Sequence, residues 1–211
     1  MLRKMARSVQ FDREKMRAVI LRVCRSCAPS DLGAVKLNKV LYYADMIHYA
    51  HYRAPVTGAT YRKRPNGPAS DQLLFLLRDM ERVGDIKIDN VDYYGFFKKE
   101  YVPLAEEPQG VLNEVETGIL DDVIEFVCRQ NTARSISEYS HALPWEMAEM
   151  GGEIPYPSAM LLFPMQPSPE AFEAVERGMS EVEAARSQGD TVGVRSLAAF
   201  RSSVLEAVGQ R

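Results

Sequence analysis

The sequence contains no run of apolar residues that approaches the roughly 20 needed to cross a bilayer. Its first residues are basic but have no apolar segment behind them, so we expect no secretory signal, a cytoplasmic location and no membrane partner. Cysteine is also scarce, because Cys24, Cys27 and Cys128 are the only 3 in 211 residues. A chain of this size needs no disulfide staples, so we expect all of them to be reduced thiols.

The sequence also lacks the short motifs that mark common enzyme classes. It has no glycine-rich phosphate loop, no nucleophile elbow and no HExxH zinc motif. A zinc site would have to join Cys24 and Cys27 to Cys128 and His141 across about a hundred residues, which is far wider than structural zinc patterns. Cys24 and Cys27 fall on the apolar stripe of a predicted helix, where core packing explains them. We therefore expect no catalytic residue, no metal and no cofactor, and a protein that is not an enzyme.

One cluster of ionisable residues remains as a candidate for chemistry. Asp45, His48 and His51 stand three residues apart on a predicted helix, so neighbours in this set lie one turn apart. The set could hold a metal or act as a general base. A local hydrogen bond from Asp45 to His48, with His51 partly buried near the helix end, is the alternative. We prefer it because no nucleophile or further ligand accompanies the set at a recognisable spacing, so Asp45 and His48 are predicted to be structural.

Positive charge is concentrated in the first third of the chain, although the formal net charge is −3. Residues 1–64 contain 14 Lys and Arg against 4 Asp and Glu, so the remainder is acidic. A basic face of this kind can meet an acidic protein surface or a phosphate backbone, or it can pack against the acidic part of its own fold.

Hydrophobic spacing predicts a protein built mainly from helices. An amphipathic helix should begin at Asp12, a plausible N-cap. Ser30-Asp31 should cap the next and most apolar helix, which begins near Lys36. This helix must end before Pro55, because proline cannot continue a helix and disfavours helical geometry in the residue before it.

The segment after this helix combines an extended run with a sharp turn. Residues 57–63 are predicted to form a short strand, and Asn66-Gly67-Pro68 ends it. Glycine permits backbone conformations that other residues avoid, and Pro68 suits the first turn of a following helix. Gly67 and Pro68 are therefore predicted to be structural residues of the turn.

Residues 86–104 are rich in aromatic and β-branched residues and predict a hairpin. The turn of this hairpin lies either at Asp89-Asn90 or at Gly95, and the sequence does not decide between them. Together with the strand at 57–63, the hairpin could form a small antiparallel sheet packed on helices. The expected fold class is therefore α+β and predominantly α-helical.

Helix starts further along the chain complete this picture. Capping boxes are predicted at Asn113–Glu116 and at Ser135–Glu138. The chain should divide into a basic leader at 1–10, a main domain at 11–160 and a C-terminal helical hairpin at 165–211. This hairpin could dock on the main domain, bind a partner or form a homo-oligomer.

Two stretches of the sequence resemble a known family. KLNKVLYYAD at 36–45, followed by an extended segment and a Gly-Pro turn, is similar to the Panacea domain of SocA-like antitoxins, formerly a domain of unknown function. SISEYSHALPW at 135–145, with Gly151-Gly152 after it, resembles the closing segment of the same family. The resemblance covers residues 31–157. Asn66 stands where this family is expected to have an aromatic residue before Gly-Pro.

The resemblance implies a function in protein binding. SocA-like antitoxins neutralise a cognate protein toxin by direct contact, and at least one kind acts as a proteolysis adaptor that delivers its toxin to a cytoplasmic AAA+ protease. We therefore expect a toxin encoded next to this chain as the partner. The candidate contact residues lie on the basic strand, at its turn and in the closing segment: Tyr61, Arg62, Arg64, Asn66 and Trp145. Trp145 packs either as a core anchor, which we favour, or as an interface hot spot.

A winged-helix-like transcriptional regulator is the alternative function. Arg62-Lys63-Arg64 follow Tyr61 on an extended segment that could track phosphates. The predicted hairpin carries acidic residues such as Asp89 and is not predominantly basic, so DNA is the less favoured partner.

Overall fold

A computed structural model of the chain describes residues 9–93 and 95–162. The predicted C-terminal helical hairpin at 165–211 and most of the predicted basic leader at 1–10 lie outside these residues. Within the part that the structure describes, no helix is both long enough and apolar enough to span a membrane.

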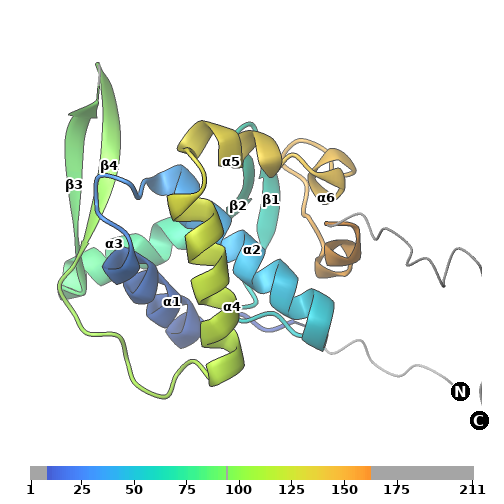
Figure 1. Cartoon of the computed structure of the whole chain (residues 1–211), viewed down its shortest axis with the longest axis horizontal. Helices are drawn as coiled ribbons and strands as arrows, with labels where there is room; N and C mark the ends of the chain where they lie inside the picture. Colours follow the sequence, from blue (N-terminus) through green and yellow to red (C-terminus); the bar gives the residue numbers. More distant parts are fainter. Residues whose placement is uncertain (1–8, 94, 163–211) are drawn as a thin grey trace, which may run out of the picture. The chain divides into compact units, whose positions relative to one another are not determined.

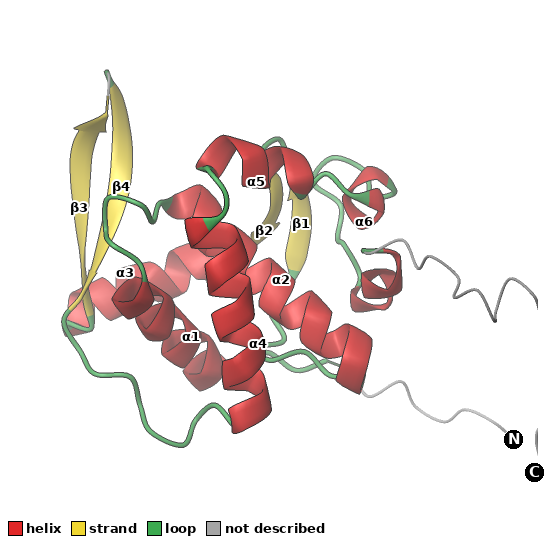
Figure 2. Cartoon of the chain, in the orientation of Figure 1, coloured by secondary structure: helices red, strands yellow, loops and turns green. Residues whose placement is uncertain are grey.

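The fold is α+β and mainly helical, as predicted (Figure 2). The helices are α1 (Arg13–Ser26), α2 (Ala34–Tyr52), α3 (Leu73–Val83), α4 (Glu114–Ile124), the π-helix η1 (Glu125–Arg129), α5 (Ala133–Tyr139), α6 (Leu143–Glu146) and the 3-10 helix η2 (Tyr156–Leu161). The strands are β1 (Tyr61–Arg64), β2 (Gly67–Ser70), β3 (Ile86–Tyr93) and β4 (Phe96–Pro103).

The helix α2 lies at the centre of the domain (Figure 1). It contacts α1, α4, α5, η2 and β2, and most of its residues are buried. Gly33 is its N-cap and makes no side-chain hydrogen bond, so the predicted cap at Ser30-Asp31 is wrong. The predicted cap of α1 is confirmed, because the Asp12 side chain accepts a hydrogen bond from the Lys15 N–H.

The strands β1 and β2 form a tight antiparallel hairpin in which Lys63 pairs with Pro68. Pro68 therefore belongs to a strand, and the prediction that it begins a helix is wrong, because α3 begins only at Leu73. β2 is an edge strand of a two-stranded sheet. Pro68 is tolerated there because an edge strand does not need every backbone N–H for pairing with a neighbour. The predicted strand at 57–63 is shifted towards the turn.

The second hairpin, β3–β4, forms a separate sheet, so the two predicted β segments do not join. Ile86 pairs with Pro103 and Tyr93 with Phe96, which places the turn at Gly95 and not at Asp89-Asn90. Gly95 has a φ of +83°, and its N–H donates to the Asp92 side chain at 2.9 Å. The hairpin projects from the helical body in Figure 1.

Capping explains where the later helices begin. Asn113 and Glu116 form the predicted capping box at the start of α4, with both reciprocal hydrogen bonds present. The second capping box is formed by Thr132 and Ser135, so the predicted box at Ser135–Glu138 is displaced by three residues. Three residues shift the start of α5 by nearly one turn.

Candidate functional site

Asp45 is fully buried and holds the segment that follows α2. Its carboxylate accepts hydrogen bonds from the Thr57 N–H at 2.6 Å and from the Tyr61 hydroxyl at 2.8 Å. Burial raises the pKa of Asp45, and the hydrogen bonds from Thr57 and Tyr61 oppose that rise. The predicted hydrogen bond to His48 is absent among the described contacts. His48 instead places Nδ1 2.6 Å from the Ala54 carbonyl oxygen.

The other candidates for chemistry do not converge on this carboxylate. His51 is exposed, contrary to the prediction that it is partly buried. The three cysteines are free and buried, and the burial of Cys24 and Cys27 agrees with the core packing predicted for them. In residues 9–93 and 95–162, no group of three or more His, Cys, Asp and Glu side chains is placed to hold a metal ion.

Lys39, from the first turns of α2, supports the β1–β2 turn from below. Its side chain is 1% exposed, and Nζ donates to the carbonyl oxygens of Asn66 at 2.6 Å and Pro68 at 2.9 Å. Gly67 lies directly over this amine with a φ of +89°. A Cβ atom on Gly67 would lie 2.6 Å from Lys39 Nζ and closer still to Ser140 Oγ. The β1–β2 turn therefore packs against α2 and the end of α5.

Replacement of Gly67 by alanine should lower the free energy of unfolding by more than about 2 kcal/mol. The left-handed conformation alone costs an alanine about 1–2 kcal/mol, and the contacts with Lys39 and Ser140 add to that cost. Urea unfolding followed by circular dichroism measures the change. Gly110→Ala is the matched control, because Gly110 has a φ of +74° and nothing within 4 Å of its would-be Cβ. Equal losses in the two variants would contradict the close packing of Gly67.

Burial lowers the pKa of Lys39 to about 7 from the ordinary value of 10.5. Between these values the unfolded chain binds more protons than the folded one, so Lys39 makes stability rise with pH. The free energy of unfolding of the wild type, relative to that of Lys39→Met, should therefore increase between pH 7 and pH 9.5. The slope of this difference should be at most about 1.4 kcal/mol per pH unit. Urea unfolding of both proteins with a reductant present measures this, and a constant difference would refute it.

The β1–β2 turn and α6 together form one surface. The Trp145 indole N–H donates to the Arg64 carbonyl oxygen at 3.1 Å, and Lys63 Nζ lies 4.0 Å from the centre of a Trp145 ring. The His141 ring stacks on Trp145 with centroids 3.9 Å apart and planes at 13°. Burial lowers the pKa of His141, and Lys39 adds to that effect. Trp145 is half-buried, so it both anchors the turn and faces solvent.

The structure divides the predicted contact residues into two groups. Arg64, Asn66 and Trp145 lie together at the turn, where Arg64 and Asn66 are exposed. Arg62 is half-buried, and its Nε donates to Asp71 at 2.5 Å. Tyr61 is 1% exposed, so it supports β1 from the core and offers no side-chain surface.

Three exposed apolar side chains on either side of Trp145 in the sequence add to this surface, and they were not predicted from the sequence. Leu143 is 45% exposed, Met147 67% and Met150 63%. The same segment returns along β1, because Lys63 Nζ donates to the Ala148 carbonyl oxygen at 3.0 Å. Exposed apolar patches with polar rims mark protein-binding sites. We call this the turn–α6 surface, defined by Arg64, Asn66, Leu143, Trp145, Met147 and Met150.

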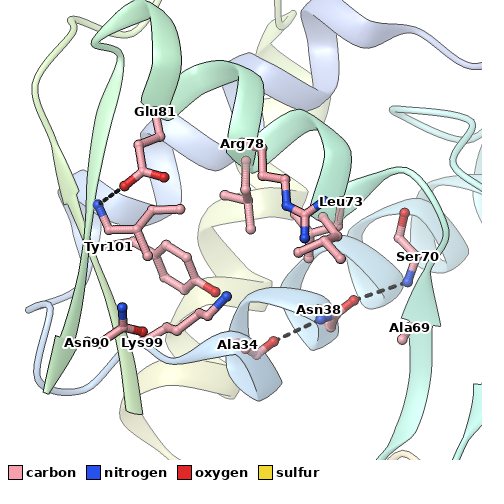
Figure 3. Close-up of a pocket in the computed structure, with 13 residues that line it drawn as sticks. Ala34, Asn38, Ala69, Ser70, Leu73, Arg78, Glu81, Asn90, Lys99 and Tyr101 are labelled. Atoms are coloured by element: carbon pink, nitrogen blue, oxygen red, sulfur yellow. Dashed lines mark hydrogen bonds between the residues drawn. The ribbon is translucent and has the colours of Figure 1, made fainter. Parts of the chain in front are cut away.

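A groove of about 360 Å³ lies elsewhere, between α3, the β3–β4 hairpin, the start of α2 and β2 (Figure 3). None of the predicted site residues lines it. Its hairpin wall consists of Ile88, Asn90, Lys99 and Tyr101, which share a face only in the observed register. The sequence could therefore have indicated this groove only if the turn of the hairpin had been assigned.

The fold and these surfaces define a small, mainly helical α+β domain. The family model described as antitoxin SocA-like, Panacea domain, matches residues 37–146, slightly more than half of the 211 residues. The chain therefore belongs to the SocA-like antitoxin family with a Panacea domain, as the resemblance predicted. This membership gives the protein a role related to toxin–antitoxin systems and a toxin as its general class of partner. A search of curated proteins and a search of solved structures each find no match.

Proposed function

We propose that this protein neutralises a cognate protein toxin by direct contact through the turn–α6 surface. The observation that carries the proposal is that Arg64, Asn66, Leu143 and Trp145 of this surface lie within the family match, while Met147 and Met150 follow its last residue. Residues 37–146 extend from α2, which carries Lys39 beneath the turn, to the end of α6. The surface combines a half-buried tryptophan with exposed methionines, which are the side chains that dominate protein interfaces.

The chemistry of the surface favours binding over catalysis. Trp145 supplies an aromatic anchor, Met147 and Met150 supply adaptable apolar contacts, and Arg64 supplies a positive rim. None of these groups requires a metal or cofactor to act. A toxin with an acidic patch beside an apolar pocket would complement this arrangement.

The fate of the bound toxin is a finer part of the proposal. Contact could mask the active surface of the toxin, or it could deliver the toxin to a cytoplasmic AAA+ protease. The half-life of the toxin in cells with and without this protein separates the two routes, because masking leaves the half-life unchanged and delivery shortens it.

The DNA-binding alternative has weaker support. Arg62 is paired with Asp71, and the β3–β4 hairpin carries Asp89, Asp92 and Glu100 beside its lysines. These carboxylates reduce the attraction of both segments for a phosphate backbone. A gel shift with the DNA upstream of the gene should leave the fragment unshifted.

Co-expression with the adjacent open reading frame tests the proposal. That frame should arrest growth when expressed alone, and growth should recover when this protein is present. A frame that is harmless alone, or that arrests growth equally with this protein present, would refute the proposed function.

A further inference from the structure

The groove between α3 and the β3–β4 hairpin is separate from the turn–α6 surface and has no part in the proposed neutralisation. Two cross-strand pairs, Ile88 with Tyr101 and Asn90 with Lys99, direct their side chains to one face of the hairpin. This face lines the groove opposite α3, which contributes Arg78 (Figure 3). We call it the α3–hairpin groove.

Three hydrogen-bond donors of the groove have no hydrogen-bond or ion-pair partner among the described residues: Arg78, Lys99 and the Tyr101 hydroxyl. Tyr101 is 1% exposed, and its hydroxyl points into the groove in Figure 3. Burial raises the pKa of Tyr101 to about 12, so the hydroxyl is a proton donor at neutral pH. A ligand acceptor in the groove would give this hydroxyl the hydrogen bond that the described residues do not supply.

The other polar groups of the groove are engaged within the protein. The Asn38 side chain donates to the Ala34 carbonyl oxygen at 2.9 Å and accepts from the Ser70 N–H at 3.1 Å. The Glu81 carboxylate accepts from the Ile88 N–H at 3.3 Å. The groove is therefore lined by two unpaired cationic side chains, one unpaired hydroxyl and only one carboxylate, that of Glu81. This balance of charge complements a negatively charged ligand group.

The remaining lining is apolar and gives the ligand a second requirement. Leu73 and Leu77 lie on the α3 wall, Ile88 lies on the hairpin wall, and Leu74 is 47% exposed beside them. A ligand that fills this groove must therefore place an apolar group next to its negative one.

The size of the groove favours a short ligand segment. A volume of about 360 Å³ is near the lower end for ligand pockets, so only a few side chains of a partner can enter it. Strand addition at β2 is blocked, because the Ser70 N–H is taken by Asn38 and Pro68 has no N–H. At the neighbouring edge of β3, the Ile88 N–H is taken by the Glu81 carboxylate. We therefore assign recognition to the side chains of the groove.

We propose that the α3–hairpin groove binds a short extended peptide segment of a protein partner, in which an acidic residue stands beside an apolar residue. The carboxylate accepts from Lys99, Arg78 and the Tyr101 hydroxyl. The apolar side chain packs on Leu73, Leu77 and Ile88. This site would give the protein a second contact, independent of the toxin surface.

The test uses the full chain labelled with ¹⁵N and two synthetic peptides. Acetyl-Leu-Asp-Leu-Glu-Leu-amide is the probe, and acetyl-Leu-Asn-Leu-Gln-Leu-amide is its uncharged match. The acidic peptide should cause saturable shifts of the backbone amides at Asn38, Ser70, Lys99 and Tyr101. The uncharged peptide should bind at least tenfold more weakly, and 0.5 M NaCl should weaken the acidic peptide severalfold.

Variants assign the binding to the groove. The double variant Arg78→Gln with Lys99→Gln should weaken the acidic peptide at least fivefold. Lys87→Gln is the matched control, because Lys87 lies on the opposite face of the same hairpin with its side chain 62% exposed, and binding should not change. Should the double variant fail to fold, the comparison of the two peptides on the wild type decides the question.

Several results would overturn the proposal. The proposal fails if the acidic peptide causes no amide shifts in the groove or if both peptides bind equally. It also fails if the folded double variant binds the acidic peptide as strongly as the wild type does. Sodium acetate that reproduces the same shifts at the same concentration would also overturn it, because the groove would then take any small carboxylate. All of these results leave toxin neutralisation untouched, since that is measured at another surface.

Discussion

Replacement of Asp45 by alanine should lower the free energy of unfolding by about 3–5 kcal/mol, because an unsatisfied buried donor costs about 1–3 kcal/mol. The substitution removes the acceptor of the Thr57 N–H and of the Tyr61 hydroxyl, both of which are buried. It also leaves a cavity between α2 and β1. Urea unfolding followed by circular dichroism measures the loss, and the expected result is a large shift of the midpoint with an unchanged slope.

Asp121→Ala is the matched control for this prediction. Asp121 is likewise a hydrogen-bond acceptor, with two bonds from Arg22 at 2.8 Å each, but its side chain is 50% exposed. An exposed pair of this kind contributes about 0–1 kcal/mol, so the control should remain close to the wild type. If Asp45→Ala were no more destabilising than Asp121→Ala, the structural role assigned to the Asp45 carboxylate would be incorrect.

Met147→Asp should abolish toxin neutralisation without unfolding the protein, given the proposed function. Met147 is 67% exposed on the turn–α6 surface, so the aspartate is solvated in the free protein and desolvated only in the complex. Burial of an unpaired charge at an interface centre should weaken binding at least a hundredfold, which corresponds to about 2.8 kcal/mol. Titration calorimetry with the purified toxin measures the affinity, and growth under co-expression gives the cellular readout.

Val83→Asp provides the matched control on another surface. Val83 ends α3 and is 65% exposed, so the same change is made at nearly the same exposure. Val83→Asp should neutralise as the wild type does. Loss of neutralisation in both variants, or in neither, would remove the turn–α6 surface from the proposal.

Local signals in the sequence predicted the starts of α1 and α4, because capping depends on residues only three positions apart. Asp12 and Asn113 cap these helices as expected. Pro68 was misassigned because its strand depends on a contact distant in sequence. Lys39 binds the carbonyl oxygens on both sides of Gly67, and a lysine buried in this way has no local signature.

The candidate site was predictable only in part, for a similar reason. Arg64 and Trp145 were identified from charge and residue type, and they meet at the surface. Tyr61 was misplaced because no local signal shows that its hydroxyl donates a hydrogen bond to Asp45, 16 positions away. Met147 was overlooked because α6 has only 4 residues, which is too short for an apolar periodicity to be recognised.

The chain that returns along β1 has a practical consequence for any shortened version of this protein. Ile154 donates its N–H to the Tyr61 carbonyl oxygen at 2.8 Å, and Lys63 donates to the Gly152 carbonyl oxygen at 2.9 Å. This returning chain closes the side of β1 that β2 does not cover. A truncation at residue 146, where the family match stops, would remove this segment. The backbone of β1 would then be exposed and could pair with other chains. A soluble fragment should therefore retain residues up to at least Leu162.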